Sequence, residues 1–223
     1  MRILVACEES QRVTNEFRRR GHQAFSCDLV PETGNHPEWH IQGDALRLIN
    51  GNCSFVTNDG KSHHIKRWDM LIAFPPCTYL TNNGNAWFNI ERYGDKARKR
   101  WQDRKEAAAF FMRFVNADCD KIAIENPVGI MSRWYQKPSQ IIHPYQFAES
   151  ETDSDNYVTK RTCLWLKGLP TLETNNLPKP DNGKLFGYYS SGKTRVWCNV
   201  VHGATKRSKT VPGVARAMAT TWA

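Results

Sequence analysis

The sequence contains no apolar run that approaches the ~18 residues of a membrane-spanning helix. It has no Cys-x-x-Cys pair, and its seven cysteines are scattered, which argues against both a disulfide framework and a structural zinc site. Residues 1–6 have neither a basic leader nor a small-residue cleavage site, so they indicate a first strand rather than a signal peptide. We therefore expect no membrane segment and no bound metal, and a reducing, cytoplasmic compartment.

Acidic residues are almost absent from the last 65 residues of the 223-residue chain. Residues 1–158 contain 20 Lys and Arg against 20 acids, whereas residues 159–223 contain 11 Lys and Arg against only Glu173 and Asp181. The difference, 11 minus 2, is the whole net charge of +9. A concentrated basic segment is typical of proteins that bind a polyanion, so nucleic acid is the expected partner. A solvated basic surface is the simpler alternative.

Residues 69–78, Asp-Met-Leu-Ile-Ala-Phe-Pro-Pro-Cys-Thr, combine a short apolar run with an abrupt stop. Such a run is typical of a strand that is buried on both faces, as in the parallel sheet of an α/β fold. Prolines cannot continue the hydrogen-bond ladder, so Cys77 is expected just beyond the carboxyl end of this strand, where open α/β sheets bind ligands. This position favours a nucleophile over the alternative of an inert core cysteine.

Strands and helices alternate around this stretch. Residues 2–7 and 23–27 indicate strands, joined by a helix over 11–20 that Ser10 would cap. The other predicted elements are strands at Ile41, 121–125 and 163–166, helices over 95–115 and 211–219, a hairpin over 186–197, irregular chain over 47–67 and a lid loop over 79–87. The strands that end near Asp44, Cys77 and Glu125 are predicted to be neighbours, with these side chains along one edge of the sheet.

Four motifs, in this order, resemble those of the DNA cytosine-5 methyltransferase family. Phe74-Pro75-Pro76-Cys77 is similar to the motif that carries the family's nucleophile, and Glu125-Asn126-Pro127 to the motif that grips the target cytosine. Lys160-Arg161 resembles the arginine motif before the target-recognition region. Residues 210–219, Thr-Val-Pro-Gly-Val-Ala-Arg-Ala-Met-Ala, resemble the last motif, whose helix returns to the methyl-donor pocket. The resemblance covers nearly the whole chain.

The resemblance implies an α/β, Rossmann-like S-adenosylmethionine-dependent methyltransferase fold with a mostly parallel sheet and a small C-terminal recognition region. The implied divisions are a catalytic domain over 1–166, a short basic target-recognition region over 167–207, and a C-terminal helix over 208–223 that returns to the catalytic domain. The implied reaction transfers a methyl group from S-adenosylmethionine to carbon 5 of cytosine.

Three residues receive catalytic roles from this resemblance. Carbon 5 of cytosine is a weak nucleophile, and addition of a thiolate to carbon 6 activates it. Cys77 would supply the thiolate, and Glu125 the carboxyl group that protonates the ring nitrogen. Arg161 would place a positive charge on the carbonyl oxygen. In duplex DNA the target base must be flipped out of the stack to reach Cys77.

The remaining implied site residues fall into two groups. Those expected to bind the methyl donor are Cys7, Glu8, Glu9, Asp28 at the ribose, Leu29, Asp44 at the adenine amine, Pro75, Thr210 and Val211. Those expected to bind the substrate are Pro76, Asn126, Pro127, Lys160, Lys193 and Arg195, with Lys184, Tyr188, Tyr189 and Trp197 as further phosphate or stacking contacts. The implied partner is double-stranded DNA with a flipped cytosine, bound by a monomer.

The sequence departs from the family pattern at three places. The first turn, residues 6–11 (Ala-Cys-Glu-Glu-Ser-Gln), lacks the family's glycines, and its two acids could instead hold the ammonium group of the donor. Cys163 stands where the family has a second arginine. The recognition region, about 40 residues between Leu166 and Ser208, is short, which predicts short or relaxed sequence specificity.

Two other functions compete with this one. The same chemistry could act on single-stranded nucleic acid, RNA or a free cytidine nucleotide, because the recognition region is so small. A catalytically inactive relative that only binds nucleic acid would explain the missing glycines, although it would have no reason to retain both Cys77 and Glu125. The compact chain suits a phage or mobile-element enzyme.

Overall fold

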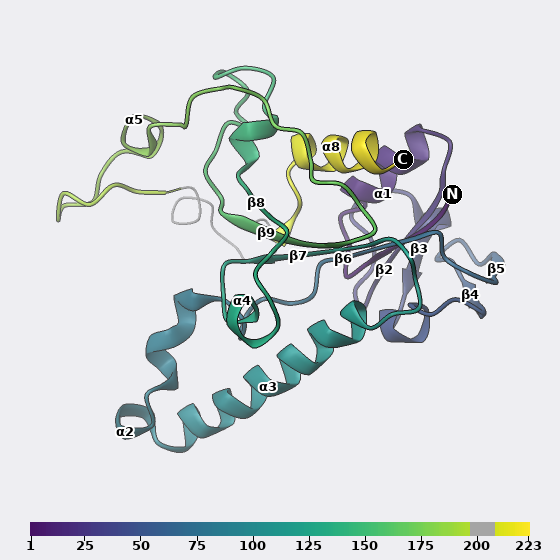
Figure 1. Cartoon of the computed structure of the whole chain (residues 1–223), viewed down its shortest axis with the longest axis horizontal. Helices are drawn as coiled ribbons and strands as arrows, with labels where there is room; N and C mark the ends of the chain where they lie inside the picture. The colour runs from purple at the N-terminus through teal and green to yellow at the C-terminus, as the bar shows by residue number, and fades with distance from the viewer. Residues whose placement is uncertain (197–207) are drawn as a thin grey trace.

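The computed structural model describes residues 1–196 and 208–223. Seven strands form one sheet in the order β3-β2-β1-β6-β7-β9-β8 (Figure 1). Their bounds are β1 (Arg2–Ala6), β2 (Gln23–Asp28), β3 (His40–Gln42), β6 (Met70–Ala73), β7 (Ile122–Pro127), β8 (Gln140–Ile142) and β9 (Thr162–Lys167). Strands β3, β2, β1, β6 and β7 pair in parallel, whereas β9 is antiparallel to both β7 and β8. The predicted α/β architecture with a mostly parallel sheet is confirmed, and this sheet is compatible with a Rossmann-like fold.

The helices lie on both faces of the sheet (Figure 1). The α-helices are α1 (Arg12–Arg19), α2 (Ile90–Tyr93), α3 (Asp95–Val115), α4 (Met131–Trp134), α5 (Asn182–Phe186) and α8 (Pro212–Trp222). Short 3-10 helices are η1 (Pro37–Trp39), η2 (Ala45–Arg47), η3 (Asn82–Phe88) and η4 (Pro144–Phe147). The prediction of a long helix over 95–115 is confirmed, and so is the C-terminal helix, which begins at Pro212 and extends to Trp222.

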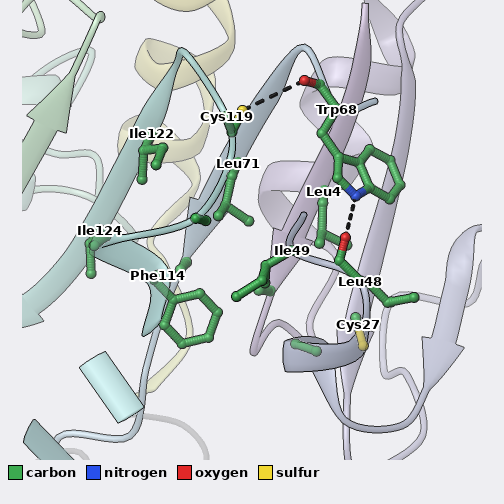
Figure 2. Close-up of a cluster of buried hydrophobic side chains, with 14 of the residues drawn as sticks. Leu4, Cys27, Leu48, Ile49, Trp68, Leu71, Phe114, Cys119, Ile122 and Ile124 are labelled. Carbon is green, nitrogen blue, oxygen red and sulfur yellow. Dashed lines mark hydrogen bonds between the residues drawn. The ribbon is translucent and has the colours of Figure 1, made fainter. Parts of the chain in front are cut away.

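The core consists of two layers, because successive side chains of a strand point to opposite faces. On one face Leu4, Leu71 and Ile124 pack with Phe114 of α3 and with Trp68 (Figure 2). On the other face the intervening side chains pack against α1 and α8, among them Ile3, Ile72, Ala123, Val214 and Met218. Strand β6 and residues 3–6 of β1 are therefore apolar and buried on both faces, as the sequence predicts for a sheet that is covered on both sides.

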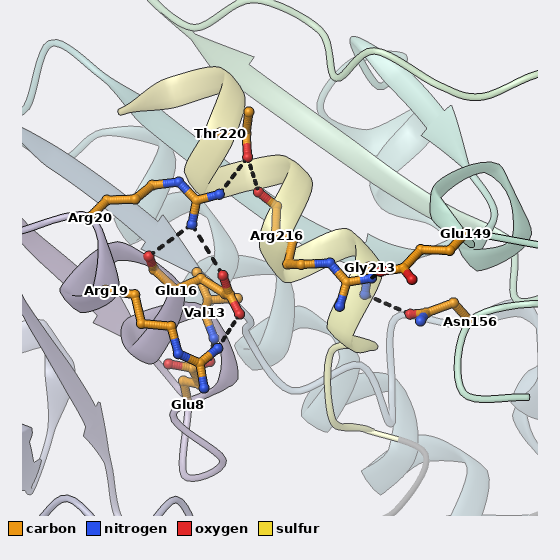
Figure 3. Close-up of polar contacts among 10 residues, drawn as sticks. All are labelled: Glu8, Val13, Glu16, Arg19, Arg20, Glu149, Asn156, Gly213, Arg216 and Thr220. Atoms are coloured by element: carbon orange, nitrogen blue, oxygen red, sulfur yellow. Dashed lines mark hydrogen bonds and ion pairs between the residues drawn. The ribbon is translucent and has the colours of Figure 1, made fainter. Parts of the chain in front are cut away.

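Helix α8 is attached to α1 and to the loop before β9 (Figure 3). The Arg20 guanidinium donates a hydrogen bond of 2.6 Å to the Thr220 hydroxyl. At the start of α8, the Gly213 N–H donates to Asn156 Oδ1 at 2.6 Å. A Cβ atom at position 213 would overlap the Phe147 carbonyl oxygen, so this close approach requires glycine. These contacts fix the beginning of α8 beside the edge of the sheet where the parallel strands end.

The order of the strands reverses between β1 and β6. From β1 the chain proceeds outward through β2 to β3, and then returns to β6 on the other side of β1. The Phe74 N–H donates a hydrogen bond of 3.0 Å to the Ala6 carbonyl oxygen, so the two strands are paired up to their carboxyl ends. Open α/β sheets bind ligands outside such a reversal point. Residues 7–11, after β1, and residues 74–77, after β6, both lie there.

Several sequence predictions need correction. Residues 47–67 are not irregular, because β4 (Cys53–Val56) and β5 (Ser62–Ile65) form an antiparallel hairpin. Strand β3 is not a neighbour of β6, since β2 and β1 lie between them. Asp44 is therefore on the same edge as Cys77 and Glu125 but far along it. Ser10 does not cap α1; the structure assigns the N-cap to Gln11, whose side chain makes no capping bond.

The basic segment after β9 has little regular structure among its described residues. It contains α5 and an isolated bridge between Tyr188 and Thr194. This bridge confirms part of the predicted hairpin over 186–197, whereas Trp197 lies outside the described residues. In Figure 1 the segment that carries α5 extends away from the sheet. Among the described helices, none is long and apolar enough to cross a membrane.

Candidate functional site

Two of the sequence motifs are joined directly at the carboxyl edge of the sheet. The Asn126 side chain is 1% exposed, and its Nδ2 donates a hydrogen bond of 2.7 Å to the Pro75 carbonyl oxygen. This bond ties the end of β7 to the turn that leaves β6. Pro75 is buried, Pro76 is exposed and Cys77 is half-buried. The pair of prolines therefore carries the chain out of the sheet and leaves Cys77 at its rim.

The loops that follow these two motifs are paired with each other. The Ile130 N–H donates to the Leu80 carbonyl oxygen at 2.8 Å, and Thr81 forms a β-bridge with Gly129. A Cβ atom at position 129 would overlap the Leu80 carbonyl oxygen. Gly129 is thus required by the close approach of the two backbones. The Cys77 carbonyl oxygen accepts hydrogen bonds from the Leu80 and Thr81 N–H groups at 2.9 and 3.0 Å, which closes a tight turn at Cys77.

Arg104 of α3 anchors the chain beyond Cys77, and sequence reasoning missed it. Its side chain is 3% exposed; Nε donates to the Tyr79 carbonyl oxygen at 2.7 Å and an Nη atom donates to Asn85 Oδ1 at 2.8 Å. The guanidinium lies 3.5 Å from the centre of the Phe88 ring, within range of a cation–π contact. Most of the predicted lid over 79–87 is therefore the 3-10 helix η3, which Arg104 anchors to α3.

A small pocket adjoins Glu125. Its volume is about 20 Å³, which is room for roughly one water molecule. Glu125 comes from β7, Thr162 begins β9, and Lys160 lies two residues before that strand. The remaining lining residues are Ile142, Pro144, Thr210, Val211 and Val214. Burial raises the pKa of the Glu125 carboxyl, and the nearby Lys160 charge and a hydrogen bond from Thr162 oppose this rise. The pocket thus holds a carboxyl group whose neutral form is favoured.

Lys160 and Arg161 differ in position although they are adjacent in sequence. Lys160 lines the pocket with Glu125, whereas the Arg161 side chain is exposed. The Arg161 charge affects two other groups: after burial and Lys179, it helps to lower the pKa of His143, and it opposes the burial that raises the pKa of Cys163 to about 11. The structure therefore brings Lys160 to Glu125 and does not bring Arg161 there.

The turn after β1 adopts a glycine-like backbone without glycine. Cys7 has φ 59° and Gln11 has φ 55°, both in the left-handed region that glycine usually occupies. The Cys7 and Glu8 N–H groups both donate to the Cys27 carbonyl oxygen, at 2.7 and 3.2 Å. The absence of glycines from this turn therefore does not prevent the tight conformation that they would allow.

Glu8 is used by the protein itself. Its carboxylate is 3% exposed and accepts hydrogen bonds from the Val13 N–H at 2.6 Å, the Thr14 N–H at 3.3 Å and the Thr14 hydroxyl at 2.7 Å. These donors lie at the beginning of α1, where a negative charge is favoured. Burial nevertheless raises the pKa of Glu8 to about 7, against these hydrogen bonds. Glu8 therefore closes the N-terminus of α1, the role that the sequence had suggested for Ser10.

Glu9 is the second acid of this turn. Its Oε1 atom is buried and has no hydrogen-bond partner in the described chain. This oxygen forms an ion pair with Lys209, whose Nζ lies 3.7 Å away and also donates a hydrogen bond of 2.8 Å to the Thr33 hydroxyl. A buried carboxylate oxygen without a hydrogen bond is a suitable acceptor for an ammonium group.

The other residues predicted to bind the methyl donor are distributed along the same edge. Asp28 ends β2, and Leu29 after it is 72% exposed. Asp44 is exposed, and its Oδ1 accepts a hydrogen bond of 2.9 Å from the Leu46 N–H at the start of η2. Thr210 and Val211 are far from these acids in sequence but line the pocket beside Glu125. The Thr210 carbonyl oxygen accepts a hydrogen bond of 2.8 Å from Arg12.

The predicted substrate contacts Lys193 and Arg195 lie on the segment that extends from the sheet. Both side chains are exposed, and the Arg195 guanidinium lies 5.2 Å from the centre of the Tyr189 ring. Tyr188 beside it is 58% exposed. Pro127, the remaining substrate residue, ends β7 and pairs with Thr162. Aromatic rings flanked by arginine are suited to stacking on nucleic-acid bases.

Neither a metal centre nor a known family identifies this site. Within residues 1–196 and 208–223, no group of three or more His, Cys, Asp or Glu side chains could hold a metal ion. The six described cysteines form no disulfide, and Cys198 lies outside the described residues. No model of a protein family matches the chain, and no curated protein matches its sequence.

Proposed function

We propose that the protein is a DNA cytosine-5 methyltransferase that acts through a covalent adduct of Cys77 and has short or relaxed sequence specificity. The observation that carries this proposal is the hydrogen bond from Asn126 Nδ2 to the Pro75 carbonyl oxygen. It holds the two motifs that the reaction requires, Pro-Pro-Cys and Glu-Asn-Pro, against each other at the carboxyl edge of the sheet. The strand order, with its reversal point between β1 and β6, supports a ligand site at that edge.

The side chains at this edge suit the chemistry. The Cys77 thiolate would add to carbon 6 of cytosine while the Glu125 carboxyl donates its proton to the ring nitrogen, so that no full negative charge develops on the ring. Burial raises the pKa of Glu125, and this favours the protonated form that the step needs. After methylation, loss of the proton from carbon 5 to a base, departure of the thiolate and return of the ring-nitrogen proton to the Glu125 carboxylate would restore the aromatic ring.

The residues after β1 and β2 fit S-adenosylmethionine as the methyl donor. Glu9 Oε1 is a buried acceptor without a hydrogen bond and would receive the donor's ammonium group. Asp28 would bind the ribose hydroxyls, and the exposed Leu29 side chain would cover the adenine. Asp44 would accept a hydrogen bond from the adenine amine. When bound, this group would supply the methyl group to carbon 5 of the cytosine.

The segment that extends from the sheet supports nucleic acid as the substrate. Its exposed Lys184, Lys193 and Arg195 would contact phosphates, and Tyr188 and Tyr189 would stack on bases. Among the described residues of this region the only helix is the five-residue α5. So small an element offers few side chains to base edges, which supports short or relaxed specificity.

Methyl transfer is the experiment that tests this function. The full-length protein is incubated with labelled S-adenosylmethionine and, separately, duplex DNA, single-stranded DNA, RNA or dCMP. We expect label in 5-methylcytosine with duplex DNA. Transfer only to single-stranded nucleic acid, RNA or dCMP would retain the chemistry and change the substrate. Absence of transfer to all four, together with retained DNA binding, would favour a nucleic-acid-binding protein without this activity.

Two cysteine substitutions test whether Cys77 is the nucleophile. Cys77→Ser should abolish transfer, because a serine hydroxyl is far less nucleophilic at neutral pH. Cys53→Ser is the control, since Cys53 is a buried residue of the β4–β5 hairpin and does not lie at the carboxyl edge of the large sheet. Full activity of Cys77→Ser would remove Cys77 from the mechanism.

A further inference from the structure

The cation in the pocket of Glu125 is Lys160, whereas the sequence resemblance implied a catalytic role for Arg161. Lys160 lines this pocket beside Glu125 and Thr162, whereas the neighbouring Arg161 is exposed to solvent. Both residues precede β9, which begins at Thr162, so each is placed by the chain that leads into the strand. Leu164 packs on the α8 face of the sheet, and Cys163 packs on the α3 face. Thr162 lies in step with Leu164, and Lys160 lines the same pocket from the residues just before the strand.

We infer that Lys160, rather than Arg161, is the catalytic cation of this site, and that its ammonium group binds the carbonyl oxygen of the pyrimidine beside Glu125. This inference rests on the proposed function and assigns one of its roles. A lysine is suitable here because its ammonium group is a compact charge on a flexible stem, able to follow the base as electron density moves toward the carbonyl oxygen. No covalent bond to Lys160 forms or breaks in this step; it donates a hydrogen bond while the proton comes from Glu125.

The surroundings of Glu125 contain few other charges that could take this role. On the β9 side, Lys160, the Thr162 hydroxyl and, behind them, the Cys163 thiol are the titratable or polar groups. The start of α8 contributes Thr210, Val211 and Val214 to the pocket, and the β8 side contributes Ile142 and Pro144, none of which is charged. From β6, the neighbouring strand, Cys77 is the titratable group at the same edge.

Lys160 and burial have opposite effects on the protonation of Glu125. Burial is the larger effect and raises the pKa of this carboxyl, while the Lys160 charge lowers it. Removal of that charge therefore has two separable consequences. The carbonyl oxygen loses its hydrogen-bond donor, and Glu125 retains its proton to a higher pH. A residue with only a structural role would reduce activity without the second consequence.

The test compares Lys160→Met, Arg161→Met and Lys167→Met in the full-length protein. Lys167 is an exposed residue at the other end of β9 and serves as the control. We expect Lys160→Met to lower kcat/KM by about 100-fold, as removal of one oxyanion donor does. Its pH–rate profile should also lose activity at higher pH than that of the unsubstituted protein. Lys160→Arg should restore part of the rate, and Lys167→Met should match the unsubstituted protein.

Three outcomes would overturn this inference. If Arg161→Met abolishes transfer and Lys160→Met does not, the assignment to Lys160 is wrong and the proposed function stands. If Lys160→Met is slow but its pH profile is unchanged, Lys160 has a structural role only. If the unsubstituted protein transfers methyl groups to no substrate, the proposed function fails and this assignment fails with it.

Discussion

The Asn126 side chain and the Pro75 carbonyl oxygen are joined by a hydrogen bond of 2.7 Å between two buried groups. Asn126 follows Glu125 on β7, and Pro75 precedes Cys77 by two residues. One bond therefore ties together the backbone segments that carry the carboxyl group and the thiol that we propose to work together. Because the bond is buried, its loss would lower the free energy of unfolding, since a buried carbonyl group without a hydrogen-bond partner is unfavourable.

We predict that Asn126→Ala lowers both stability and activity. Loss of the donor leaves the Pro75 carbonyl oxygen unpaired and should lower the free energy of unfolding by about 1–3 kcal/mol. A displacement of Cys77 by ~1 Å is expected to lower methyl transfer by about 100-fold. Urea unfolding and a transfer assay measure the two effects, with Asn116→Ala as the control because Asn116 is exposed at the end of α3. Unchanged transfer in a folded Asn126→Ala protein would contradict the proposed role of this bond.

Gly129→Ala should be destabilising for a different, purely steric reason. Its new methyl group would meet the Leu80 carbonyl oxygen, so the two loops of the site must separate. We expect a loss of about 1–3 kcal/mol in the free energy of unfolding, as for other overpacked positions. Gly43→Ala is the matched control, because a Cβ atom there meets nothing within 4 Å. Equal stability of the two variants in urea would show that the loops can separate at no cost.

Arg104 gives a prediction about the chain beyond Cys77. Arg104→Lys retains the charge but cannot donate to the Tyr79 carbonyl oxygen and to Asn85 with one planar group. We expect faster proteolysis within residues 79–88 and slower methyl transfer. The control is Arg113→Lys, an exposed position on the same helix. Protection of residues 79–88 equal to that of the unsubstituted protein would mean that η3 does not depend on Arg104.

The pKa of Glu8 predicts how stability changes with pH. Burial raises this pKa from 4.5 to about 7 in the folded protein, so the folded state holds the proton more tightly than the unfolded state. Between pH 4.5 and pH 7 the free energy of unfolding should therefore fall as pH rises. At about 1.4 kcal/mol per pH unit, this single group can account for up to about 3 kcal/mol.

The Glu8→Gln variant tests this dependence. A glutamine cannot lose a proton, so the fall in stability between pH 4.5 and pH 7 should be smaller than in the unsubstituted protein. The variant should also be less stable at every pH in this range, because its amide nitrogen would face the N–H donors of α1. Glu91→Gln, at an exposed site, is the control. Parallel curves for Glu8→Gln and the unsubstituted protein would rule out Glu8 as the source of the slope.

Much of the fold was predictable because its central elements are unambiguous in sequence. The apolar runs of β1 and β6 are strand-length and buried on both faces, and the second half of α3 has an apolar side that includes Ala108, Phe111 and Phe114. The β4–β5 hairpin was not predicted, because its residues are mostly polar. Only Cys53 and Phe55 of β4 point inward, and this alternation is too short to distinguish from irregular chain.

The candidate site was predictable in its residue types but not in its arrangement. The position of Cys77 beyond a strand follows from two prolines in sequence. The choice between Lys160 and Arg161 depends on how the chain enters β9 at Thr162, and neither this path nor the start of a strand can be located to one residue from sequence alone. The role of Glu8 depends on hydrogen bonds to Val13 and Thr14, which form only when the turn after β1 adopts two left-handed residues. Arg104 could have been found, because it falls on the buried face of α3 between Ala97 and Ala108 at helical spacing.

The basic segment after β9 yields a prediction about how the affinity for DNA depends on salt concentration. If Lys193 and Arg195 contact phosphates, each releases counterions when DNA binds, and the slope of log affinity against log salt falls by about 0.9 for each contact removed. We therefore expect Lys193→Ala/Arg195→Ala to weaken binding to all sequences alike and to reduce this slope by nearly two units. Lys137→Ala is the control at an exposed site outside this segment. A loss confined to one DNA sequence would instead indicate base readout by these side chains, and an unchanged slope would place the DNA elsewhere on the protein.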